Sequence, residues 1–297
     1  IRIGHVNIRS LLTRNLLNAG RPDKFDNLQI ILSAHRFHVF VVGESWVKGV
    51  DSQLLAIPGY NMYRLDRDYS GPSCDHGGLL VYVRDNIGVQ FGQCHNLPVY
   101  GNNGTIRSLL QYLDLEVQFD ENFPRIRVVA VYNPPYGGNG DAMLCVHQQG
   151  NPTGLLPLFS DELEDTVILG DVNIDICGNN YQDYQNFVSN NLGFLQCIHE
   201  PTRINGTLLD HIYFKGRPQG QGAFITEAGV IPPGNGFQLG GFADHKIIYC
   251  TVGNSQEQNL QTPQNIQTRP FNQNPQRKEQ ELNNGNYNND LTLNFGN

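Results

Sequence analysis

Residues 166–173 read TVILGDVN, and this stretch sets the pattern from which the fold is predicted. A run of β-branched and apolar residues that ends at Gly170 is typical of a strand. Asp171 and Asn173 follow it, and side chains two residues apart on a strand point the same way. Since Asp and Asn after a strand are most often turn residues, this segment alone does not establish a site.

Similar strands are predicted along most of the chain. The first alternates apolar and polar residues over 1–8, and the next is the apolar run 39–42, which ends at Gly43 with Glu44 just beyond it. Many strands with few helices favour β-sheets packed face to face with helices outside. Further strands are expected at 59–65, 78–84, 108–117, 125–132, 209–214 and 246–251, and helices at 23–37, 154–163 and 181–192.

The composition predicts two regions. Residues 1–253 have the apolar content of a folded domain, whereas 254–297 are rich in Asn and Gln and poor in apolar residues. Such a segment buries too little surface to offset its chain entropy, so we expect a disordered linker or tail. Because the chain opens at Ile1, inside a predicted strand and without Met, we expect it to be part of a longer polypeptide.

Bulk properties limit the classes of function. The longest apolar runs fall short of the roughly 20 residues that a membrane-spanning helix needs, so no membrane partner is expected. The six cysteines show no spacing typical of a zinc or redox motif, which favours free thiols in a reducing, intracellular compartment. A net charge of −8 argues against a general DNA-coating protein but is compatible with the clustered carboxylates of a metal site.

Polar residues stand at several other predicted strand ends. They are Asn7, Glu44, Asp210 and the pair Asp244-His245. Oxygen ligands from carboxylates and amides are those that Mg²⁺ prefers, and Mg²⁺ usually keeps waters to share with a substrate phosphate. Each residue alone could equally be a turn, loop or solvated strand-end residue. The prediction of a metal site therefore rests on the number of such residues at strand ends.

The order of these motifs resembles the endonuclease/exonuclease/phosphatase superfamily, and within it the apurinic-type endonuclease domain of non-LTR retrotransposons. The resemblance covers roughly residues 1–252. It is carried by the segments NIRSL (7–11), GESW (43–46), RLDR (64–67), YNPP (132–135), GDVN (170–173), PTR (201–203), LDHI (209–212) and ADH (243–245).

The resemblance implies an α/β fold, a four-layer α-β-β-α sandwich with two packed mixed β-sheets, and an active site at one rim. It implies that Glu44, Asn7 and Asp244 lie at the metal, which would be Mg²⁺ with Mn²⁺ as a possible substitute. The implied catalytic roles are these: Asp171 deprotonates the attacking water, Asn173 holds the phosphate, Tyr132 contacts the phosphate or the leaving group, His245 donates to a phosphoryl oxygen, and Asp210 fixes the ring of His245. Three arginines are expected to contact DNA, namely Arg203, Arg67 and Arg9.

The resulting expectation is an Mg-dependent endonuclease that nicks one strand of double-stranded DNA and leaves a 3′-hydroxyl for target-primed reverse transcription. Its partners would be the DNA and a reverse transcriptase region of the same parent polypeptide, and its location the nucleus. Two alternatives stay open. One is a phosphodiesterase or phosphatase of the same superfamily acting on a small substrate, and the other is a non-catalytic binding module on this fold.

The sequence departs from the family pattern at three positions. Arg9 stands where the cellular apurinic-repair branch has an acid, which weakens any expectation of abasic-site repair. Val172 replaces the usual aromatic residue and Ala243 the common Ser before Asp-His. These last two changes affect packing or remove one hydroxyl, so the chemical groups of the expected site are all present.

Overall fold

The computed structural model describes eleven segments of the chain. They are residues 1–12, 24–67, 77–100, 106–135, 147–148, 151–152, 155–159, 164–177, 181–217, 222–231 and 243–254. Ile1–Gln261 forms one compact unit, and the second unit, Thr262–Asn297, lies outside the described residues. The expected linker 254–297 therefore lies outside them as well, except for Asn254, the last residue of the final strand.

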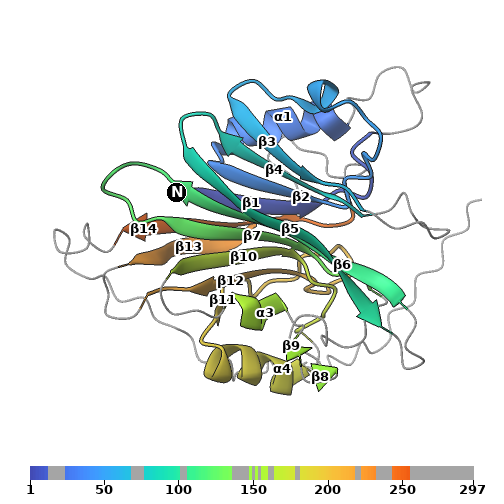
Figure 1. Cartoon of the computed structure of the whole chain (residues 1–297), viewed down its shortest axis with the longest axis vertical. Coiled ribbons are helices and arrows are strands. Elements are labelled where there is room, and N and C mark those ends of the chain that lie inside the picture. The colour runs from blue at the N-terminus through green and yellow to red at the C-terminus, as the bar shows by residue number, and fades with distance from the viewer. Residues whose placement is uncertain are drawn as a thin grey trace, which may run out of the picture. The chain divides into compact units, whose positions relative to one another are not determined.

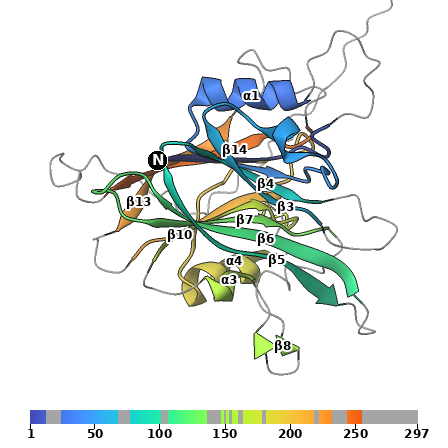
Figure 2. The same ribbon diagram turned by 45° about the horizontal axis from the view of Figure 1, so that its top comes forward.

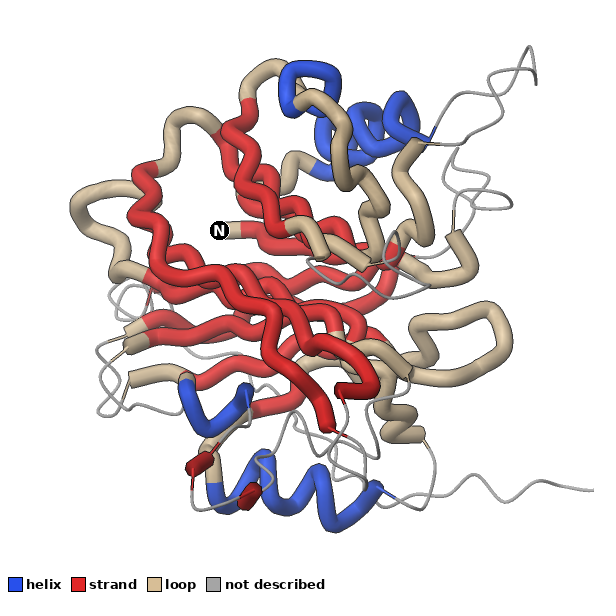
Figure 3. The backbone as a smooth tube through the Cα atoms, turned by 45° about the vertical axis from the view of Figure 1, so that its right-hand side comes forward, coloured by secondary structure: helices blue, strands red, loops and turns tan. Residues whose placement is uncertain are grey.

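Two six-stranded mixed sheets form the centre of the unit (Figures 1 and 3). In spatial order, sheet 1 consists of β13 (Ala223–Ile231), β14 (Ile247–Asn254), β1 (Arg2–Asn7), β2 (Val39–Gly43), β4 (Leu79–Arg84) and β3 (Tyr60–Leu65). Sheet 2 consists of β11 (Leu195–Gln196), β12 (Asp210–Lys215), β10 (Asp165–Asp171), β7 (Ile126–Tyr132), β6 (Ile106–Gln118) and β5 (Gly88–Tyr100). A separate short ribbon pairs β8 (His147–Gln148) with β9 (Asn151–Pro152).

Helices lie on the two outer faces of these sheets (Figures 1 and 2). The helix α1 (Lys24–His35) and the 3₁₀ turn η1 (Ser52–Leu55) cover sheet 1, whereas α3 (Leu155–Leu158), α4 (Gln182–Asn186) and the π-helical turn η3 (Phe187–Asn191) lie against sheet 2. The predicted four-layer sandwich is confirmed. Within the described segments, no helix is long and apolar enough to cross a membrane.

Alternation along the central strands separates two apolar cores. On β1, Ile3 belongs to the core between the sheets, while Val6 packs in the core under α1. Leu28, Ile31 and Leu32 form the buried stripe of α1, as their helical spacing predicted. Because both faces of sheet 1 are covered, its inner strands are apolar along most of their length.

Most predicted elements are present, with three corrections. The strand predicted at 166–169 extends over Asp165–Asp171, so Asp171 is its last residue rather than a residue beyond it. The helix predicted at 154–163 is Leu155–Leu158 within the described residues, and 160–163 lie outside them. The helix predicted at 181–192 is split into α4 and η3.

Gly170 is the position in β10 where a side chain has no room. A Cβ atom there would lie 1.8 Å from the Val131 carbonyl oxygen of the neighbouring strand β7. We expect Gly170→Ala to lower the free energy of unfolding by about 1–3 kcal/mol or more, because the backbone must shift to admit the methyl group. Urea unfolding would measure it, with Gly49→Ala as control, since Gly49 also has a positive φ but open space around it. An equal effect of both substitutions would contradict the steric explanation.

Candidate active site

Strand register brings the polar strand-end residues to one edge of both sheets. In sheet 1, Asn7 of β1 is paired with Gly43 of the parallel strand β2, so Glu44 follows beside Asn7. In sheet 2, Asp171 of β10 is paired with Tyr132 of the parallel strand β7 on one side and with Asp210 of β12 on the other. The sequence predicted all five residues, and the structure brings them together.

Asn7 joins the acidic residues of the two sheets. Its amide Nδ2 donates to Glu44 Oε1 at 2.8 Å and to Asp171 Oδ2 at 2.6 Å, whereas its Oδ1 accepts from the backbone N–H of Arg9 at 3.2 Å. Asn7 and Asp171 are buried, and Glu44 is half-buried. Two carboxylates from different sheets therefore converge on a single amide group.

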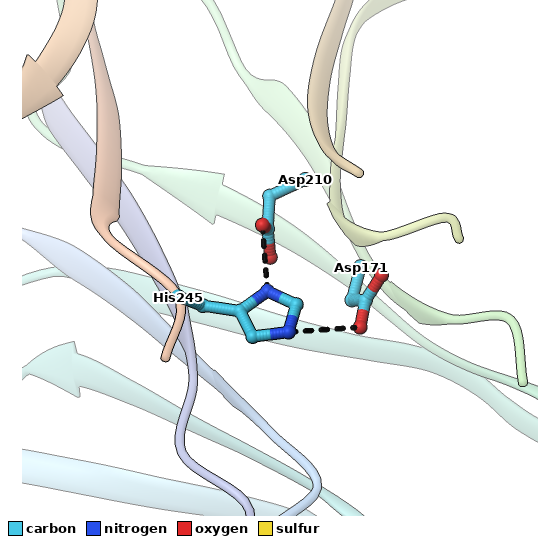
Figure 4. A group of neighbouring side chains, drawn as sticks. All are labelled: Asp171, Asp210 and His245. Atoms are coloured by element: carbon cyan, nitrogen blue, oxygen red, sulfur yellow. Dashed lines mark hydrogen bonds and ion pairs between the residues drawn. The ribbon is translucent and has the colours of Figure 1, made fainter. Parts of the chain in front are cut away.

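Asp210 and His245 form the second half of the site (Figure 4). His245 Nδ1 donates to Asp210 Oδ2 at 2.8 Å, and His245 Nε2 lies 3.9 Å from Asp171 Oδ2, too far for a direct hydrogen bond. The hydroxyl oxygen of Thr202 accepts from the Asp210 backbone N–H at 3.1 Å and fixes the start of β12. The ring of His245 is thus held with Nε2 directed toward Asp171.

Burial and neighbouring charges shift the pKa values of these groups. Burial, followed by the negative charge of Asp210, raises the pKa of Asp171 to about 8. Burial lowers the pKa of His245, but the charge of Asp210 and the hydrogen bond to it outweigh this and raise it to about 9. Burial also acts to raise the pKa of Asp210, yet the charge of His245 and its hydrogen bond bring it below the usual range, so Asp210 is ionised.

Tyr132 and Asn173 lie next to this cluster. Burial and the charge of Glu44 raise the pKa of Tyr132 well above its usual value, so its hydroxyl remains protonated and hydrogen-bonds with Glu44. The Asn173 backbone N–H donates to Asp171 Oδ1 at 3.0 Å, and its side chain donates to the Asn133 carbonyl at 2.7 Å. Since β10 ends at Asp171 and Asn173 has a positive φ of 54°, the expected strand alternation between these two residues does not apply.

Asp244, expected at the metal with Glu44 and Asn7, has its charge paired with arginines. Its Oδ2 accepts a hydrogen bond from the Arg203 guanidinium and lies 3.5 Å from Arg9 Nη1. Burial acts to raise the pKa of Asp244, but the hydrogen bond from Arg203 outweighs it and lowers that pKa. The Arg9 side chain is 56% exposed and that of Arg203 28%, so both are open to a ligand at the rim, whereas Arg67 is only 8% exposed and its charge acts on Tyr132 inside the site.

Two groups of side chains could hold a metal ion. Ligand atoms of Asp171, Asp210 and His245 lie within 4.8 Å of one another, so this cluster could bind a divalent cation. Both oxygens of Asp210 already accept hydrogen bonds from imidazoles, however. The carboxylate oxygens of Glu44 and Asp171 suit Mg²⁺ better, because they are hard ligands and because Asp171 is buried beside the negative charge of Asp210, so that a cation would stabilise its ionised form. Asn7 presents Nδ2 to both acids and its Oδ1 accepts from the Arg9 backbone N–H, so its amide would have to turn to place an oxygen on the cation.

Backbone strain is concentrated at this edge. Among the described residues other than glycine, a positive φ occurs at Arg9, Ser10, Glu44, Trp46 and Asn173, and also at Arg36 away from the site. Such conformations are unfavourable for residues with a side chain and persist where the surrounding structure imposes them. The chain segments that follow β1, β2 and β10 all turn in this way, which directs Glu44 and Asn173 into the cluster.

Two residues of the site were not predicted from the sequence. One is Thr202, whose hydroxyl accepts from the backbone N–H groups of Leu209 and Asp210. The other is His5, whose Nε2 lies 3.1 Å from Asp210 Oδ1 in the buried interface between the sheets. The period of two along β1 puts His5 on the same face as Asn7, and this signal could have identified it.

Comparisons with known proteins rest on structure. No protein-family model matches the chain, and no curated protein sequence matches it. An endonuclease/exonuclease/phosphatase from Bacteroides vulgatus superposes with a TM-score of 0.60 at 11% identity, covering 86% of this chain and 98% of that one.

Two further structures agree with this likeness. A mannosyl-6-phosphatase of Bacteroides thetaiotaomicron has a TM-score of 0.58 at 13% identity, over 85% of this chain and 99% of its own. The human Nocturnin catalytic domain, with a bound sulfate anion, has a TM-score of 0.56 at 14% identity, over 86% and 93%. These likenesses show that the chain has the fold shared by the endonuclease/exonuclease/phosphatase proteins.

Proposed function

We propose that the protein is a divalent-metal-dependent phosphodiester hydrolase, and specifically a DNA endonuclease that nicks one strand and leaves a 3′-hydroxyl. The observation that carries this proposal is the convergence of an oxygen-rich group, Asn7, Glu44 and Asp171, with the Asp210–His245 pair at one edge of the two sheets. Acidic oxygens suit a hard cation, and a carboxylate-held imidazole suits a phosphoryl oxygen. The fold likeness to phosphatases and to other phosphate-handling proteins supports the same class of chemistry.

In this proposal the residues divide the work of phosphodiester hydrolysis. Glu44 and Asp171 would hold Mg²⁺ or Mn²⁺, joined by Asn7 once its amide turns Oδ1 toward them, and the cation would supply Lewis-acid stabilisation of charge on the phosphate oxygens. Asp171 takes the proton of the attacking water, and His245 Nε2 donates to a phosphoryl oxygen while Asp210 holds its ring. The 3.9 Å between His245 Nε2 and Asp171 Oδ2 is short enough for one water to accept from His245 and donate to Asp171.

The remaining site residues bind the substrate. The protonated hydroxyl of Tyr132 donates to the phosphate or the leaving oxygen, and Asn173, braced by Asn133, holds the phosphate. Arg9 and Arg203 at the rim contact the DNA backbone, and Arg67 acts from inside the site beside Tyr132. Phosphate contacts of this kind position a duplex without reading its sequence. Asp244 orients the two rim arginines in the metal-free protein.

The biological setting follows from the same proposal. A nick with a 3′-hydroxyl is a primer for a polymerase, which would suit a reverse transcriptase region in the same parent polypeptide. Such an enzyme would act on double-stranded DNA in the nucleus. The motif order quoted for residues 7–11, 43–46, 170–173 and 209–212 supports this narrower assignment.

A plasmid assay tests the activity and its metal dependence. We expect supercoiled plasmid to become open circle in Mg²⁺ and to stay supercoiled in EDTA, with Glu44→Ala as the inactive control, because the chemistry depends on a Lewis-acid cation. The nicked product should be extended by a DNA polymerase without prior phosphatase treatment. Equal cleavage in chelator would contradict the metal-dependent mechanism.

Small substrates distinguish the rival phosphatase. The mannosyl-6-phosphatase of the same fold makes a phosphomonoester substrate a specific alternative. Bis(p-nitrophenyl) phosphate and p-nitrophenyl phosphate present a diester and a monoester with the same leaving group. Turnover of the monoester together with intact plasmid would favour a phosphatase, and turnover of neither substrate with intact plasmid would favour a non-catalytic module.

A further inference from the structure

His5 binds the carboxylate that holds the catalytic histidine. His5 Nε2 lies 3.1 Å from Asp210 Oδ1, while His245 Nδ1 lies 2.8 Å from the other oxygen, Oδ2. We propose that His5 is a positioning residue that fixes the carboxylate plane of Asp210 and thereby the orientation of the His245 ring. This inference rests on the proposed function for its effect on turnover, but its structural content can be tested without activity.

The location of His5 makes this contact possible. Strand β1 alternates, so that Ile3, His5 and Asn7 point from sheet 1 toward sheet 2, whereas Val6 points toward α1. His5 and Asp210 are both fully buried. The bond therefore runs from the central strand of one sheet to the first residue of β12 in the other, in the same buried layer as the site.

The neighbouring strand leaves room for the imidazole ring. A Cβ atom on Gly43 would lie 3.1 Å from His5 Cε1, closer than ordinary van der Waals contact. The absence of a side chain at Gly43 thus lets the ring lie against β2 and reach Asp210. Gly43 directly precedes Glu44, so the segment that accommodates His5 also carries an acid of the site.

The hydrogen-bond roles are fixed by chemistry. An ionised carboxylate only accepts, so both imidazole nitrogens that contact Asp210 must carry a proton. His245 then has its proton on Nδ1, and its Nε2 faces Asp171. His5 donates from Nε2, and its buried Nδ1 has no hydrogen-bond partner within the described part of the chain.

Loss of His5 would leave Asp210 Oδ1 without this buried donor. The carboxylate would be free to turn about its terminal torsion, which is soft in Asp. His245 would then lose the single orientation that its bond to Oδ2 imposes. Partners that orient a functional imidazole in this way typically change activity by about 10- to 100-fold when removed.

The test combines kinetics with nitrogen NMR of histidine-labelled protein, the His245 signals being assigned from His245→Ala. In His5→Leu we expect kcat for nicking to fall by about 10- to 100-fold with KM little changed, and the His245 Nδ1 shift to move because its hydrogen bond to Asp210 Oδ2 is no longer held in one geometry. His5→Gln, which keeps an N–H donor, should recover most of the turnover and the wild-type His245 spectrum. Should His5→Leu fail to fold, His5→Asn replaces it, because its shorter amide does not reach Asp210.

Ile3→Ala is the matched control, since Ile3 is buried on the same strand and face as His5 but has an apolar side chain that cannot hydrogen-bond to Asp210. It should lose stability and keep both kcat and the His245 spectrum. An unchanged His245 spectrum in His5→Leu, or a loss in His5→Gln as large as that in His5→Leu, would overturn the proposal. Inactive wild-type protein would instead refute the proposed function, while the NMR comparison would still decide the role of His5.

Discussion

Asp171→Asn is expected to reduce the nicking rate by about 10³- to 10⁴-fold and to raise the melting temperature of the metal-free protein. The rate falls because asparagine cannot accept the proton of the attacking water and offers the cation a neutral ligand. The stability rises because the fully buried Asp171 carboxylate is next to Asp210 and Glu44, so its ionised form is unfavourable in the folded state. Steady-state nicking and thermal unfolding measure the two effects on one preparation.

The stability effect has a defined pH range. The pKa of Asp171 is raised from 3.8 to about 8 on folding, so the folded protein holds a proton that the unfolded chain has released between these values. The contribution of Asp171 to the free energy of unfolding therefore falls as pH rises from about 4 to 8 and is constant above that range. The advantage of Asp171→Asn in melting temperature should grow over the same interval, and an advantage independent of pH would contradict this explanation.

A second aspartate provides the control for this prediction. Asp114 is also buried but pairs with Arg127 at 2.8 Å, so its charge has a partner. Asp114→Asn should lower the melting temperature, the opposite of the change in Asp171→Asn, because it removes the buried partner of Arg127 and leaves that charge only the more exposed pair with Glu164 at 3.3 Å. It should leave the nicking rate unchanged.

Removing the Asp210–His245 pair is the second large effect. We expect His245→Ala and Asp210→Asn each to lower kcat by about 10²- to 10³-fold, and the double variant to be no worse than His245→Ala, because Asp210 acts through the imidazole. A double-mutant cycle on plasmid nicking measures this coupling. His95→Ala, which removes an exposed histidine on β5, is the control and should keep full activity.

If the fold-loss of kcat in the double variant equals the product of the two single fold-losses, the two residues act independently. Asp210 would then have a contact with substrate or cation of its own, and the Asp171, Asp210 and His245 cluster would become the better candidate for the metal centre.

The inner strands of both sheets were predictable from the sequence, and of the four edge strands only β3, expected at 59–65, was predicted. The inner strands β2, β7 and β10 are buried along their length, which produces continuous apolar runs that identify them. The edge strands β5 and β13 were not predicted, because one side of each has no neighbouring strand and many of their residues are exposed. Their sequences therefore carry little apolar alternation.

The site was predictable where its residues stand at the ends of apolar runs. Asn7, Glu44, Asp171, Asp210 and His245 follow or precede such runs, and strand register brings them together. The partners of Asp244 could not be predicted, since Arg203 and Arg9 reach it from segments far apart in the chain. Tertiary contacts of this kind leave no local signal in the sequence.

The backbone at Glu44 and Asn173 is left-handed, with φ of 49° and 54°. This conformation also bears on the alternative that the protein is a non-catalytic binding module. Glycine would adopt either conformation more readily than glutamate, and Asn is tolerated better than most residues. A domain that served only as a binding scaffold would not need a carboxylate at the more strained of these two positions. Glu44→Gly should therefore stabilise the fold while it removes the carboxylate that accepts from Asn7, so that stability and chemistry make opposite demands on this one residue.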